Sequence, residues 1–142
     1  PIDRTRTALS PVYEVLRNVP REGAVIDVPV REHPQVGGYV YPQVVHERPI
    51  IIGRVYFRSG SGQATKFILY LELRNEEEYD MEPIMGMTEL LGVGFRFFVI
   101  HWNWLDEDMA GHVRRLMEQF CTVLADDPQD NITVYEIVNP AR

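Results

Sequence analysis

Apolar positions recur at helical spacing in three separate parts of this chain. Ser10 and Pro11 provide a predicted N-cap and first helical residue, and apolar residues follow at intervals of three and four. Pro83 opens a second predicted helix, and residues 106–120 form a third with Asp106 as its N-cap. The expected inner faces are Ile84, Met87, Leu90 and Leu91 in the second helix, and Met109, Val113, Leu116, Met117 and Phe120 in the third.

Short runs of β-branched and aromatic residues between these helices predict strands. The clearest are AVIDVPV near 24–30 and FRFFVIHW near 95–102. A third run near 50–57 contains Gly53, and a polar turn divides residues 121–138 into two further strands. The run KFILYLELR at 66–74 fits either a helix or a strand by periodicity, and we expect a helix.

These elements predict a single α/β domain in which helices pack on a small mixed sheet. The chain has 142 residues, enough for one domain that buries about two-thirds of the surface its unfolded form exposes. Residues 1–9 are polar and unpatterned, so we expect a linker or tail there and the domain at 10–142. No apolar run approaches the roughly 20 residues that a membrane-spanning helix needs.

Charge and cysteine content exclude several classes of function. The net charge is −7 and the fourteen basic residues are scattered, which argues against nucleic-acid binding. The single Cys121 excludes an internal disulfide framework and a multi-thiolate metal site, and we expect it to be a small buried apolar residue rather than a nucleophile. The four histidines are far apart and no catalytic motif is present, so we expect no metal, no cofactor and no catalytic residue.

The densest group of candidate binding residues lies in residues 38–58, GYVYPQVVHERPIIIGRVYFR. Pro42 favours a helical turn in which Gln43 and His46 share one face, directly before an apolar strand. His46 and Arg48 either contact a polar ligand or cap the C-terminus of that turn, where cations meet the helix dipole favourably.

Two further candidates stand near the ends of predicted strands, where ligands collect in α/β sheets. Asp27 is either a carboxylate at the edge of the sheet where the strands end, or a residue that caps a turn before Pro29. His101 either faces the ligand edge or is a half-buried histidine bonded to a backbone carbonyl.

The order of motifs along the chain resembles a known family. PVYEVL, AVIDVPV, YPQVVHERPIIIGRVYFR, ELLGVGFRFFVIHW and ITVYEIV follow one another between residues 10 and 138. This order is similar to that in the C-terminal soluble domain of bacterial multi-pass membrane glycosyltransferases of the GT-C type, which use polyprenyl-phosphate-linked sugars. The family pattern has a segment Y-x-Q-T-x-H-G-K-P followed by an apolar strand with a glycine and a final arginine.

The marked positions of that pattern are largely present in this sequence. Those that match are Tyr41, Gln43, His46, Pro49, Gly53, Tyr56 and Arg58. Arg48 replaces the usual Lys, Val44 stands where Thr is common, and Glu47 stands where Gly is common. In addition, Phe57 precedes Ser59 out of the usual order. The resemblance implies ligand contacts by Tyr41, Gln43, His46, Arg48 and Arg58, and these departures weaken that implication.

The resemblance implies a non-catalytic domain on the extracytoplasmic face of a bacterial membrane. Its partners would be the transmembrane part of the same polypeptide and a lipid-linked sugar or acceptor glycan. The catalytic acids of the family lie in the membrane part, so this domain alone would be inactive. Two alternatives stand beside it: a free-standing small-molecule or protein-binding module with its ligand near His46 and His101, and a small hydrolase that uses either histidine with Asp27.

Overall fold

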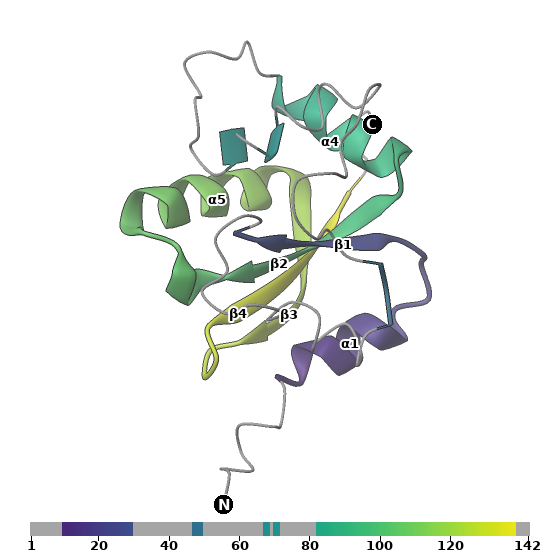
Figure 1. Ribbon diagram of the computed structural model, residues 1–142, viewed down its shortest axis with the longest axis vertical. Helices are drawn as coiled ribbons and strands as arrows, with labels where there is room; N and C mark the ends of the chain where they lie inside the picture. Colours follow the sequence, from purple (N-terminus) through teal and green to yellow (C-terminus); the bar gives the residue numbers. More distant parts are fainter. Residues whose placement is uncertain (1–9, 30–46, 50–66, 69, 72–81, 139–142) are drawn as a thin grey trace, which may run out of the picture.

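The protein has the α/β fold that the sequence predicts. A computed structural model describes residues 10–29, 47–49, 67–68, 70–71 and 82–138. Four strands form one mixed sheet in the order β1-β2-β4-β3, in which β1 and β2 are parallel and the other pairs are antiparallel (Figure 1). The strands are β1 (Ala24–Val28), β2 (Phe95–His101), β3 (Cys121–Asp127) and β4 (Ile132–Ile137).

Helices cover both faces of the sheet, because the central strands are apolar on both sides. Val25, Phe97 and Val99 pack against α1 (Val12–Asn18) on one face. Ile26 and Phe98 face the other way, toward α4 (Pro83–Gly92) and α5 (Glu107–Phe120). The layers are visible in Figure 1, where α1 lies apart from α4 and α5.

The prediction for residues 106–120 is confirmed. Asp106 is the N-cap of α5, and its Oδ1 accepts a hydrogen bond of 2.8 Å from the backbone N–H of Met109. The predicted apolar face is buried from Val113 to Phe120 and partly buried at Met109. His112 is also buried, and its Nε2 lies 3.0 Å from the carbonyl oxygen of Tyr70.

The helix opened by Pro83 is confirmed, but the prediction that Ile84 belongs to its inner face is wrong. Met87 and Leu90 are fully buried, whereas Ile84 is 46% exposed. The buried positions include Gly86, whose missing side chain lets Phe67 approach the helix backbone. The expected helix at 66–74 is confirmed at residues 67–68 and 70–71, which have helical backbone.

Smaller differences concern element ends. Pro11 occupies the N-cap position of α1 rather than its first turn, while Ser10 Oγ still accepts a hydrogen bond from the N–H of Val12. The strand predicted near 24–30 ends at Val28, because Pro29 has no N–H to continue the ladder. The tail at 1–9 and the strand predicted near 50–57 lie outside the described residues.

Candidate functional site

The two candidate residues predicted at strand ends are hydrogen-bonded to each other. Strands β1 and β2 are parallel, and Asp27 is in register with Val99, so both strands end at the same edge of the sheet. His101 follows Val99 by two residues and therefore has its side chain on the same face as Asp27. Its Nε2 lies 2.9 Å from Oδ1 of Asp27, and the side chains are 4% and 3% exposed.

The surroundings of this pair are apolar. Asp27 and His101 continue the face of the sheet that packs on α1, where Tyr13 is also buried. Burial raises the pKa of Tyr13, and the nearby Asp27 carboxylate raises it further. Oδ2 of Asp27 has no hydrogen-bond partner among the described residues. A buried acceptor of this kind is costly unless a donor reaches it.

Trp104 covers the pair from the solvent side. It ends the 3₁₀ turn η3 (Trp102–Trp104), which follows β2 directly. The rings of Trp104 and His101 are stacked, with centroids 4.7 Å apart and an interplanar angle of 19°. Trp104 is 38% exposed, so an apolar aromatic surface faces solvent above a buried imidazole and carboxylate. We call Asp27, His101 and Trp104 the strand-end site.

The turn between β3 and β4 holds η3 in place. The backbone N–H of Trp102 donates to the carbonyl oxygen of Asn131 at 3.1 Å. The side-chain amide of Asn131 donates to Oδ1 of Asn103 at 2.7 Å, and Trp102 Nε1 donates to Thr133 Oγ1 at 2.8 Å. These bonds attach Trp102 and Asn103 to Asn131 in the turn and to Thr133 on β4, and Trp104 follows them directly, beside His101.

Arg48 has the capping role that the sequence left open, but for a different helix. Its guanidinium donates to four backbone carbonyls, one in the last turn of α1 and three in the segment that follows the helix. The distances are 2.7–3.3 Å. The accepting residues are Leu16, Val19, Arg21 and Gly23. The guanidinium also lies 4.5 Å from the ring centroid of Phe97. Burial lowers the pKa of Arg48, and the surrounding carbonyls supply the acceptors that this partly buried cation requires.

The other candidates lie in residues 38–58, the segment that the sequence favoured most. Tyr41, Gln43, His46 and Arg58 lie outside the described residues, so their ligand contacts remain predictions. Sequence reasoning did not single out Trp104. The signal was available: the sequence WNW follows directly after the strand that carries His101.

The sequence predicts that Cys121 is a small buried apolar residue rather than a nucleophile. It is partly buried at the start of β3, and burial raises the pKa of its thiol to about 12. The reactive thiolate is therefore scarce near neutral pH. No group of three or more His, Cys, Asp or Glu side chains suited to a metal ion occurs within the described ranges.

Comparison of the chain with protein-family models, curated proteins and solved structures finds no match. Among the residues that the structure describes, no helix has the length and apolar character to cross a membrane.

Proposed function

We propose that this chain is the extracytoplasmic C-terminal domain of a membrane glycosyltransferase-like protein, and that it helps to bind the acceptor glycan or the lipid-linked sugar. The strand-end site carries the proposal. It combines a partly exposed indole with a buried carboxylate and imidazole at the edge of the sheet where two parallel strands end.

This combination suits a sugar on chemical grounds. A sugar ring has an apolar C–H face and a rim of hydroxyl groups, and Trp104 offers a partly exposed aromatic surface. Oδ2 of Asp27 is buried and lacks a donor among the described residues, so a sugar hydroxyl that reached it would meet an unsatisfied acceptor. An apolar platform with a few convergent polar groups is the usual composition of a small-ligand site.

The motif order of the chain supports the membrane context of the proposal. The resemblance runs from the first helix to the last strand, and it implies no catalytic residue in this domain.

Glycan binding is tested by NMR titration of the chain with neutral hexose trisaccharides. The chain has two tryptophans, so the two indole N–H signals serve as probe and internal control. We expect saturable shifts at Trp104 and little change at Trp102, whose N–H is bonded to Thr133, with a Kd on the order of 1 mM.

Paired variants connect the binding to the site. Because both Trp104 variants lose that indole signal, binding in them is followed at the backbone amides of residues 101–105. Trp104→Ala should abolish these amide shifts, and Trp104→Phe should retain part of them because it keeps an aromatic face. Asp27→Asn should weaken binding, whereas Asp130→Asn, in the β3–β4 turn, should not. Shifts that persist in Trp104→Ala would contradict the proposal.

The membrane context has an independent test in the gene. We expect apolar spans of about 20 residues to be encoded upstream of Pro1. A complete gene without them would exclude the membrane glycosyltransferase and would favour a free-standing ligand-binding module.

The Asp27–His101 hydrogen bond favours a second candidate function, a small hydrolase. A carboxylate that holds one imidazole nitrogen orients the ring for proton transfer at the other nitrogen. The test is turnover of generic ester, phosphate and glycoside substrates, with His101→Gln as the inactive control. Absence of turnover, or equal turnover by the variant, removes this candidate.

A further inference from the structure

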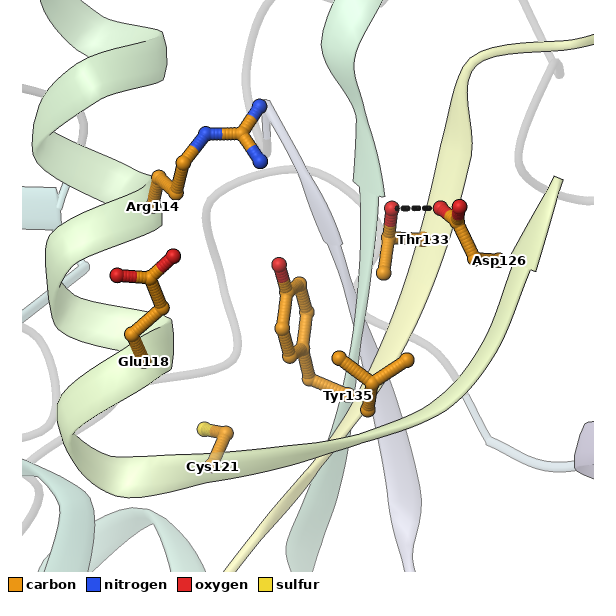
Figure 2. Close-up of a pocket in the computed structure, with 7 residues that line it drawn as sticks. Arg114, Glu118, Cys121, Asp126, Thr133 and Tyr135 are labelled. Atoms are coloured by element: carbon orange, nitrogen blue, oxygen red, sulfur yellow. Dashed lines mark hydrogen bonds between the residues drawn. The ribbon is translucent and has the colours of Figure 1, made fainter. Parts of the chain in front are cut away.

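A second site lies on the opposite face of the sheet from the strand-end site. A cavity of about 440 Å³ opens between α5 and the β3–β4 hairpin (Figure 2). This volume falls in the range of small-ligand pockets. We call it the α5 pocket; its lining residues are Arg114, Glu118, Cys121, Val123, Asp126, Thr133 and Tyr135.

Arg114 supplies the positive charge of the α5 pocket. Its guanidinium stacks over the ring of Trp102, 4.3 Å from the centroid. Stacking on an aromatic face leaves the N–H groups directed outward in the plane of the guanidinium, where a carboxylate can accept two of them. Arg114 makes no ion pair with Glu118, although the two residues are four positions apart on α5 and both line the pocket.

The same tryptophan also orients a carboxylate. Trp102 Nε1 donates to Thr133 Oγ1 at 2.8 Å, and the Thr133 hydroxyl donates to Oδ1 of Asp126 at 2.6 Å. The single hydroxyl hydrogen of Thr133 is therefore committed to Asp126, and Oδ2 of that carboxylate keeps its acceptor capacity. Trp102 therefore holds the Arg114 guanidinium against its ring face and orients the Asp126 carboxylate through the Thr133 hydroxyl.

The other polar groups of the α5 pocket line the space between Arg114 and Asp126. Figure 2 shows the Tyr135 hydroxyl pointing into the hollow, with Glu118 and Arg114 on the α5 side and the Thr133–Asp126 pair across from them. Burial raises the pKa of Tyr135, so its hydroxyl keeps its proton and can donate at neutral pH. The pocket therefore presents one guanidinium and two carboxylates around a neutral hydroxyl donor.

We propose that the α5 pocket binds a free amino acid, and a basic amino acid in preference to a neutral or acidic one. Arg114 pairs with the ligand carboxylate, and Asp126 pairs with its α-ammonium group. Glu118 adds a second negative charge, so the lining has one more carboxylate than it has cations. A ligand with one carboxylate and two cationic groups balances all three charges, which neither inorganic phosphate nor a neutral sugar does.

The test is NMR titration of the whole chain with L-lysine, L-glutamate and glucose in parallel. We expect L-lysine to give saturable shifts at the pocket lining with a Kd on the order of 1 mM, L-glutamate to bind at least about tenfold more weakly, and glucose to give no saturation there. Equal responses to L-lysine and L-glutamate, or no saturation with L-lysine, would overturn the proposal.

Two matched pairs of variants locate the binding. Arg114→Lys keeps the charge but loses the bidentate hydrogen bonding to the ligand carboxylate, so it should weaken L-lysine binding at least about tenfold. Arg115→Lys on the same helix is the control and should leave binding unchanged. Asp126→Asn keeps an oxygen that accepts from Thr133, and it should weaken binding similarly, whereas Asp130→Asn should not. Melting curves verify that each variant is folded. Unchanged binding in both pocket variants would place the ligand elsewhere and refute the assignment.

Discussion

At the scale of single residues, Arg48 shows how one side chain completes a distant helix. The last carbonyls of a helix have no partner within it, and α1 ends without a glycine cap. Arg48 donates to four carbonyls in this region from a position at least 25 residues further along the chain. The planar fork of five N–H groups suits several acceptors at once.

Replacing Arg48 should therefore destabilise the domain even when the charge is kept. We expect Arg48→Lys to lower the free energy of unfolding by about 1–3 kcal/mol, because one ammonium group cannot reach all four carbonyls. Urea denaturation measures the change. Arg17→Lys is the control, because the exposed Arg17 pairs with the exposed Glu47 at 3.5 Å and such pairs contribute little. Equal effects of the two substitutions would contradict the capping role.

The positions of the strand-end residues could be predicted, but their partners could not. Asp27 and His101 each stand near the end of an apolar, β-branched run, and that local pattern placed both near the ligand edge. Their hydrogen bond joins residues 74 positions apart, and it depends on β1 lying beside β2. Sequence periodicity describes each strand separately and contains no information on which strands are neighbours.

At the scale of elements, the packing of α4 depends on the absence of a side chain. A Cβ atom at Gly86 would lie 2.5–2.9 Å from atoms of Phe67, which is closer than packed carbon atoms come. Phe67 is fully buried and belongs to the same core cluster as Met87 and Leu90. The close approach of Phe67 explains why α4 faces inward at Gly86 and leaves Ile84 exposed.

Adding a methyl group at this contact should destabilise the domain. We expect Gly86→Ala to cost about 1–3 kcal/mol, since the overpacking outweighs the better helix propensity of Ala. Gly92→Ala is the matched control in the same helix, because nothing lies within 4 Å of its added Cβ. The control should be neutral or slightly stabilising. Thermal unfolding distinguishes the two, and a stable Gly86→Ala would show that Phe67 can move aside.

At the scale of the whole molecule, polar contacts connect elements that are far apart in the sequence. Glu136 on β4 is buried and accepts two hydrogen bonds from Arg21, at 2.5 and 2.7 Å. Arg96 at the start of β2 lies 3.8 Å from the same carboxylate. At the other end of α1, Ser10 Oγ donates to Oδ2 of Asp127 at 2.5 Å, which attaches the helix start to β3.

The Ser10–Asp127 contact should make a small, pH-dependent contribution to stability. The hydrogen bond from Ser10 holds the pKa of Asp127 below its ordinary value, and backbone N–H groups of Asp130 and Gln129 add to this effect. A carboxyl group whose folded pKa is lowered stabilises the fold above its unfolded pKa. This contribution disappears as the pH falls from the ordinary value through the lowered one.

Ser10→Ala should therefore remove about 0.5 kcal/mol of pH-dependent stability at pH 7, a value reduced for solvent screening, and less than that at pH 2. Denaturation at both pH values measures this difference. NMR titration of the Asp127 carboxyl carbon gives the direct check, because its pKa should rise toward the ordinary value in the variant. An unchanged pKa would assign the shift to the backbone donors instead.

The sequence by itself determined the features that depend on neighbouring residues. Asp106 and the apolar spacing after it are sufficient for α5, and the run FRFFVIH is sufficient for a buried β2, because capping and periodic burial are local properties. Tertiary structure alone decided that Asp27 meets His101, that Arg48 caps α1, and that Trp102 orders the α5 pocket. Each of these contacts joins distant segments, and it exists only after the strand order and the helix layers are set.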